Sequence, residues 1–204
     1  MSKIFEQPLK FVNQVKEGKH IVLFYEELEY ARLILFQFIK NGLIYGKRCS
    51  YVSEENIETV QREMADSRID INKFTKNDLL HIYQIPSLTD YPGGTQIGTE
   101  RLENIILDPW TKIGQPDRLV LRCLYKINTK EQIKSNLKWE HDYRFRDFKS
   151  LRGTMICSYP VNDIIPTISE PVGSYGKWMN DLLEIYDGVI FARKFWKGVA
   201  FNLD

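Results

Sequence analysis

Polar and aromatic side chains gather where three apolar runs of the chain end. Residues 21–25, 49–52 and 119–125 are short runs rich in branched and aromatic side chains, as buried strands require. Ligands of open α/β sheets bind beyond the carboxyl ends of the strands, so these ends predict a pocket for a small organic ligand. The candidate ligand-binding residues are Phe24, Tyr25, Glu26, Ser53, Glu54, Glu55, Arg122 and Tyr125.

The acidic residues among them also have a plain structural explanation. Glu26 and Glu27 precede an expected helix, and carboxylates suit the positive end of the helix dipole. In this structural explanation, Glu54 and Glu55 are solvated side chains of a connecting loop. Both interpretations remain open at this point.

Nucleotide hydrolysis needs a different set of residues. A phosphate-binding loop combines glycines, whose amides wrap the phosphates, with a lysine and a hydroxyl in the pattern GxxxxGK[ST]. The segment between Tyr25 and Leu33 reads EELEYAR, and its three carboxylates would repel a triphosphate by about 1 kcal/mol for each partly exposed pair. The run 119–123 carries no acid that would hold magnesium. We therefore predict no catalytic residue, no metal site and no cofactor.

The remaining elements follow from hydrophobic periodicity and from turn residues. Strands are expected at 21–25, 49–52, 79–85, 119–125 and 154–159, with 188–192 and 199–201 as a closing antiparallel pair. Helices are expected at 3–15, 28–43, 56–68, 99–113 and 128–151 and within 163–185, residues 70–78 are expected to be irregular, and residues 86–98 to form a ligand-covering loop. Strands that alternate with helices predict a three-layer α/β domain, with a mostly parallel sheet covered on both faces.

Three of these segments resemble a known family. They read HIVLFYE at 20–26, FIKNGL at 38–43 and YVSEEN at 51–56, and they are similar to the MEDS domain, a sensory domain of archaeal and bacterial regulators. That family is a degenerate relative of the KaiC/RecA-type ATPases, so the resemblance implies a RecA/KaiC-like fold that has lost its phosphate loop. Glu54 and Glu55 match the Ser-Glu-Glu triplet in which an acidic residue of the ATPases activates water.

Length and composition place the chain among ordinary globular proteins. Its 204 residues suit one domain over 1–204, with residues 1–18 as a helical lead-in, and the formal net charge of +1 gives no bulk attraction for nucleic acid or anionic lipid. The three cysteines, Cys49, Cys123 and Cys157, lie in apolar runs without a CxxC pair, which favours reduced thiols. No apolar run reaches the length that spans a bilayer, so we expect a cytoplasmic protein.

Two further segments offer interaction surfaces. Residues 138–152 interleave basic and aromatic side chains, which suits nucleic acid, but three acids dilute the charge and an exposed helix face explains the pattern better. Trp178, Phe195 and Trp196 form either a partner patch or part of the core. By analogy with the KaiC/RecA-type relatives we expect self-association. Each histidine is expected to be structural.

The function expected from the sequence is that of a non-catalytic sensory or regulatory domain. It would bind a small ligand or a protein partner in signal transduction or transcriptional regulation, as the resemblance to MEDS domains implies. A divergent nucleotide-binding ATPase and a structural or adaptor subunit are the alternatives.

Overall fold

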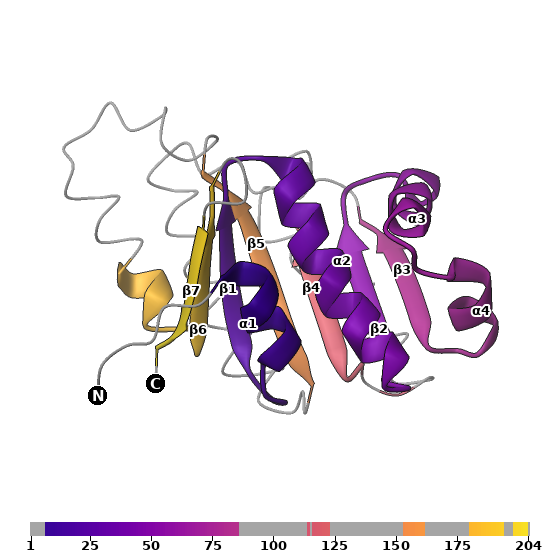
Figure 1. Ribbon diagram of the computed structural model, residues 1–204, viewed down its shortest axis with the longest axis horizontal. Helices are drawn as coiled ribbons and strands as arrows, with labels where there is room; N and C mark the ends of the chain where they lie inside the picture. The colour runs from indigo at the N-terminus through magenta and orange to yellow at the C-terminus, as the bar shows by residue number, and fades with distance from the viewer. Residues whose placement is uncertain are drawn as a thin grey trace, which may run out of the picture.

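The structure is a computed structural model that describes residues 7–85, 114, 116–122, 153–161, 180–193 and 198–203. Figure 1 shows a twisted sheet with α1 and α2 lying against it and with α3 and α4 beside β3. The elements are α1 (Pro8–Gln14), β1 (His20–Tyr25), α2 (Leu28–Ile44), β2 (Cys49–Ser53), α3 (Ile57–Asp66), α4 (Ile71–Lys76), β3 (Leu80–Gln84), β4 (Arg118–Arg122), β5 (Thr154–Pro160), β6 (Gly188–Ala192) and β7 (Gly198–Asn202).

The described strands form one sheet in the order β3-β2-β4-β5-β1-β6-β7. Every neighbouring pair is parallel except β6 and β7, which pair antiparallel. The predicted mostly parallel sheet and its closing strand pair are therefore confirmed. Central strands β1 and β5 are buried along nearly their whole length, because parallel strands lie between layers that cover both faces.

Helix α2 is the crossover from β1 to β2, and it passes over β5 and β4 on the way. Its buried side chains form a broad apolar face, and α1 packs beside it. Gly42 lies where α2 passes close to the sheet, because a Cβ at this position would stand 2.6 Å from Cys49 Sγ and 2.7 Å from Arg118 Cδ. The packing of α2 on the sheet therefore depends on the absence of a side chain at position 42.

The substitution Gly42→Ala is expected to lower the free energy of unfolding by about 1–2 kcal/mol. Overpacking of a close-packed site costs about 1–3 kcal/mol, which outweighs the gain in helix propensity from alanine of about 1 kcal/mol. Gly46→Asn is the control, because nothing lies within 4 Å of its Cβ position and asparagine tolerates the φ of +69° there. Urea denaturation measures both variants, and a Gly42→Ala protein as stable as the wild type would contradict the packing argument.

Residues 70–78 do not form the irregular segment that the sequence predicted. Asp70 is the N-cap of α4, where its side chain accepts a hydrogen bond from the backbone N–H of Lys73 at 3.0 Å. Ile71 and Phe74 pack against the core from this helix. The prediction failed because a six-residue helix is too short to show a clear periodicity, although the cap residue was a usable signal.

Several predictions fall on residues that the structure does not describe. They are the loop at 86–98, the helices at 99–113 and 128–151, most of the segment at 163–185, the basic and aromatic stretch at 138–152, and the cluster of Trp178, Phe195 and Trp196. Across the residues that are described, no helix is long and apolar enough to cross a membrane.

The Cys49 thiol is buried beneath α2, and burial raises its pKa from 9.0 to about 12. The neutral thiol stabilises the fold below a pH of about 9, and this contribution is lost as the pH rises toward 12, because only the unfolded thiol ionises in that range. At a pH of about 8.5, iodoacetamide should therefore label Cys49 at least ~100-fold more slowly in the native protein than in urea. Peptide mapping by mass spectrometry measures the rate, and equal rates would show that the thiol is accessible.

Candidate functional site

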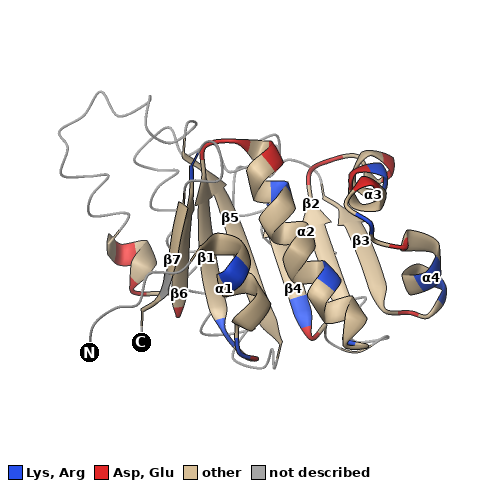
Figure 2. Ribbon diagram, viewed as in Figure 1, with Lys and Arg blue, Asp and Glu red and all other residues tan. Residues whose placement is uncertain are grey.

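The predicted site residues come together because their strands are neighbours in the sheet. Arg122 at the end of β4 lies directly opposite Ser53 at the end of β2 in the strand register, and β5 separates this pair from Tyr25 at the end of β1. Figure 2 shows acidic residues concentrated at the same edge, at the junction of β1 with α2 and along the link from β2 to α3. The carboxyl ends of these strands therefore form one polar edge of the sheet.

Two arginines hold Glu55 at this edge. Arg32, from the second turn of α2, and Arg122, from β4, each form an ion pair with the Glu55 carboxylate. Arg32 also lies 3.8 Å from the carboxylate of Glu63 on α3. Arg122 is 3% exposed, so its charge is almost fully removed from water, and the two arginines and two glutamates balance one another.

Two tyrosines complete the centre of this network. The hydroxyl of Tyr51, on β2, is fully buried, and Tyr51 packs against Phe36 of α2 with ring centroids 5.7 Å apart. Burial opposes the charge of Arg122, but its interactions with Tyr25, Tyr51 and Glu55 outweigh burial and raise its pKa above the usual value for arginine. Burial likewise raises the pKa of Tyr51 well above its ordinary range, so the phenol stays protonated and is able to donate a hydrogen bond.

The network has more buried donors than acceptors. The Nε atoms of Arg32 and Arg122 and the hydroxyl of Tyr51 are buried and meet no acceptor within the described part of the chain. Guanidinium groups donate through five N–H bonds and accept none, whereas the nearby carboxylates already face these arginines. Buried donors of this kind normally have a partner, so the site favours a group that brings acceptor oxygens.

The connection from β1 to α2 is only two residues long. β1 ends at Tyr25 and α2 begins at Leu28, which leaves Glu26 and Glu27 between them. Glu26 pairs with Arg193 at 3.0 Å, and Glu27 occupies the N-cap position without a capping hydrogen bond from its side chain. This stretch is far shorter than a phosphate-wrapping loop, and it presents carboxylates where such a loop presents amides.

The other predicted residues take different positions. Phe24 points to the opposite face of the sheet from Tyr25, as alternation along a strand requires, and it stacks on Phe191 with centroids 5.4 Å apart. The Ser53 hydroxyl accepts a hydrogen bond from the Glu55 backbone N–H at 3.3 Å and so shapes the turn after β2. Glu54 is partly exposed, and Tyr125 lies outside the described residues.

Sequence reasoning missed Arg32, Tyr51 and Glu63 as members of this network. Arg32 was visible as one of the few charged residues of a mostly apolar helix, one turn after the helix start. Tyr51 was visible as a hydroxyl-bearing residue two positions before the end of a buried strand, on the same face as Ser53. For Arg32 and Tyr51 the sequence therefore held a usable indication. Only the fold, however, shows that these side chains lie next to Glu55.

The two histidines that the structure describes lie away from this edge. His20 packs against Tyr186 with ring centroids 5.9 Å apart, and His81 lies 3.3 Å from the Asp78 carboxylate. Among the residues that the structure describes, no group of three or more histidine, cysteine or acidic side chains is placed to hold a metal ion.

The mostly parallel sheet and its helices match a KaiC-like α/β fold. A solved structure with this similarity is the KaiC-like protein of the hyperthermophilic archaeon Pyrococcus horikoshii, with a TM-score of 0.61 and 19% sequence identity over 90% of this chain and 76% of that chain. At this level of identity the likeness shows the fold alone. No protein-family model matches the chain, and no curated protein matches it.

Proposed function

We propose that this chain is a non-catalytic sensory or regulatory domain that binds a small ligand or partner group at the carboxyl ends of β1, β2 and β4. The observation that carries the proposal is the buried network of Arg32, Glu55 and Arg122, which occupies the polar edge of the sheet. The similarity of three segments to the MEDS sensory domain supports the same assignment.

The chemistry of the network argues against ATP hydrolysis at this edge. A general base must be free to accept a proton from water, but the Glu55 carboxylate is already engaged in ion pairs with two guanidinium groups. Arg122 places a positive charge where a metal-binding acid would be needed. Glu26 and Glu27 would in addition face the negative phosphates of a nucleotide.

The same network indicates the class of ligand. Buried donors on Arg32, Arg122 and Tyr51 need acceptor oxygens, and a planar carboxylate matches a guanidinium through two parallel hydrogen bonds. A carboxylate ligand would compete with Glu55 for Arg122 and so release the link between β4 and the β2–α3 turn. Ligand binding would in this way move the segment that carries Glu55, which supplies a signal.

A thermal-shift screen tests this proposal. A panel of mono- and dicarboxylates is compared with the corresponding amides, which keep the shape but lose the charge. We expect at least one carboxylate to raise the melting temperature, because a ligand that binds only the native state stabilises it by mass action. The same compound should have no effect on an Arg122→Met variant. Stabilisation by Mg-ATP together with turnover that is lost in Glu54→Gln would favour the ATPase alternative instead.

A further inference from the structure

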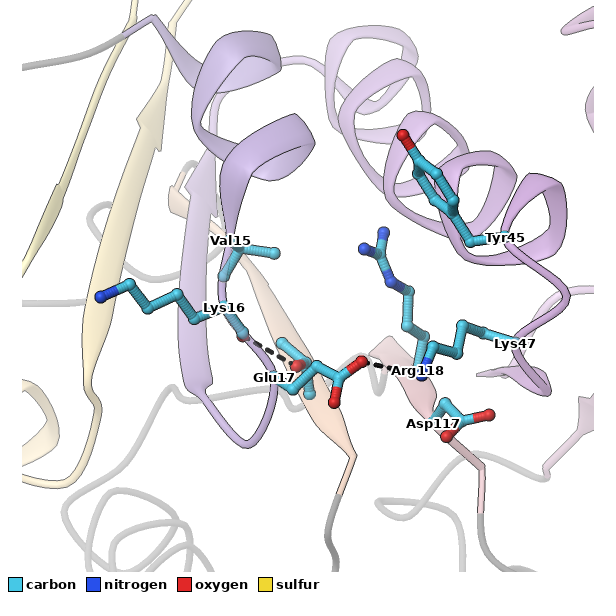
Figure 3. Close-up of a pocket in the computed structure, with 8 residues that line it drawn as sticks. Val15, Lys16, Glu17, Tyr45, Lys47, Asp117 and Arg118 are labelled. Atoms are coloured by element: carbon cyan, nitrogen blue, oxygen red, sulfur yellow. Dashed lines mark hydrogen bonds and ion pairs between the residues drawn. The ribbon is translucent and has the colours of Figure 1, made fainter.

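A hollow lies at the amino edge of the sheet, at the opposite end of β4 from Arg122. It has a volume of about 470 Å³ and opens between the ends of α1 and α2 and the starts of β4 and β5 (Figure 3). This volume lies within the range of about 300–1,000 Å³ that is usual for small-molecule sites. The charged residues that line the hollow are Lys16, Glu17, Lys47, Asp117 and Arg118.

These charged residues differ in whether they have a partner of opposite charge. Lys47 Nζ lies 2.8 Å from Glu17 Oε1, and Figure 3 shows the Lys16 side chain pointing away from the hollow. Asp117 and Arg118, in contrast, form no ion pair with any residue that the structure describes. The hollow therefore presents one anion and one cation that no direct partner neutralises.

The Arg118 guanidinium is held beneath α2 by contacts that do not neutralise its charge. It donates to the Phe38 carbonyl at 2.6 Å, and its Cζ lies 4.6 Å from the centre of the Phe38 ring. Figure 3 shows the guanidinium between Val15 and Tyr45. A guanidinium has five N–H donors, and only one of those of Arg118 has an acceptor in the described part of the chain.

The two arginines at the ends of β4 are compensated to different extents. Burial lowers the pKa of Arg118 below the ordinary value for arginine, and nearby acidic groups offset only part of this effect. For Arg122 the interactions with its neighbours outweigh burial and raise the pKa. Charges that are removed from water are normally paired, because an unpaired one is costly. Arg118 therefore favours an anion that enters the hollow.

The Asp117 carboxylate stands at the exposed rim of the same hollow. Its Oδ2 atom accepts a hydrogen bond from the backbone N–H of Arg48 at 2.8 Å, which fixes the carboxylate near the surface. Figure 3 shows that the Asp117 and Arg118 side chains extend to different parts of the hollow. Because each of them is held by a contact of its own, the two charges remain apart.

We propose that this hollow binds a small zwitterion, with its carboxylate on Arg118 and its ammonium group on Asp117. A carboxylate matches a guanidinium through two parallel hydrogen bonds, and Arg118 has donors left for them. A ligand with one charge would neutralise only one of the two residues. The ligand carries its charges at opposite ends of a short apolar chain, which lies against Val15 and Tyr45. The site is at the amino edge, so it is independent of the proposed function.

Isothermal titration calorimetry of the whole chain tests the charge requirement. The ligands are γ-aminobutyrate and ε-aminocaproate, and each is compared with the fatty acid and the alkylamine of the same length, which carry one charge. At least one of the two amino acids should bind with a Kd at least ~10-fold lower than both of its single-charge counterparts, because it alone pairs with both residues. Equal binding of a single-charge counterpart, or no binding of either amino acid, would overturn the proposal.

Two variants test whether the ligand lies in this hollow. Asp117→Asn keeps an acceptor for the Arg48 N–H but loses the charge, so the amino acid should bind it no more tightly than the fatty acid does. In Arg118→Gln the amino acid should bind no more tightly than the alkylamine does. Asp66→Asn removes a carboxylate from an exposed position on α3 and should leave the affinity unchanged.

The exposed position of Asp117 keeps this test independent of folding. Asp117→Asn should unfold at nearly the wild-type temperature, whereas Arg118→Gln also loses the contact with Phe38 and is compared only after circular dichroism shows that it is folded. Wild-type affinity for the amino acid in Asp117→Asn would place the ligand elsewhere and would overturn the proposal.

Discussion

Replacing Arg122 by methionine is expected to lower the free energy of unfolding by about 3 kcal/mol, because it removes one partner of a buried ion pair. Methionine fills most of the volume of the arginine side chain, so the loss of stability reflects the missing charge and not a cavity. Glu55 would keep Arg32 but lose the more deeply buried of its two guanidinium partners. Urea denaturation followed by circular dichroism measures the change.

Arg193→Met is the matched control for this experiment. Arg193 also pairs with a glutamate, Glu26, at 3.0 Å, but its side chain is 73% exposed. Exposed pairs contribute little, so this variant should lie within about 0.5 kcal/mol of the wild type. Combining Arg122→Met with Glu55→Gln should cost clearly less than the sum of the two single changes, since the two groups act on each other. Additive losses would show that Arg122 and Glu55 do not stabilise the fold as a pair.

Gly153→Ala should produce the other large effect, a loss of about 3 kcal/mol or more. A Cβ at this position would stand 2.3 Å from the Pro116 carbonyl oxygen and 2.7 Å from that of Asp117. These are backbone atoms of the two residues just before β4, and the Asp117 oxygen also accepts a hydrogen bond of 2.8 Å from the backbone N–H of Thr154, the first residue of β5. The neighbours of Gly42 are side chains that can shift, whereas the backbone around Gly153 can move only by separating two paired strands.

Thr154→Val serves as the control for Gly153→Ala. It removes only the hydrogen bond from the Thr154 hydroxyl to the Lys16 carbonyl, which is 3.0 Å long, and should cost about 1 kcal/mol. Thermal unfolding ranks the two variants. If Gly153→Ala were the milder change, the close approach of β4 and β5 at this edge would not be essential to the sheet.

The sequence pattern predicted the elements around the site well. Apolar runs of branched and aromatic residues located β1, β2 and β5 to within one residue or so, since strands that are buried on both faces leave a continuous apolar run. The order of the strands in the sheet could not be predicted, because hydrophobic periodicity shows which face of a strand is buried and not which strand pairs with it. Only the order shows that β4 and β5 lie between β1 and β2.

The sequence was enough to predict which residues meet at one edge of the sheet, but not how they pair. Ser53, Glu55, Arg122 and Tyr25 follow from the rule that strand ends gather at one edge. The pairing of Arg122 with Glu55 does not follow from it, because these residues are far apart in the chain and approach each other only when β2 and β4 pair. Arg32 joins them because α2 crosses directly above these strands.

We propose that this chain combines a KaiC-like fold with ion pairs, and no phosphate-binding site, at the carboxyl edge of its sheet. Isothermal titration calorimetry of the purified chain with Mg-ATP tests this most directly. The expected result is no saturable binding at millimolar nucleotide, with Arg122→Met no different from the wild type. The proposal would be contradicted by saturable binding of ATP that depends on magnesium and is competed by ADP. In that case, substitution of the acidic residues after Tyr25 should also change the affinity for ATP.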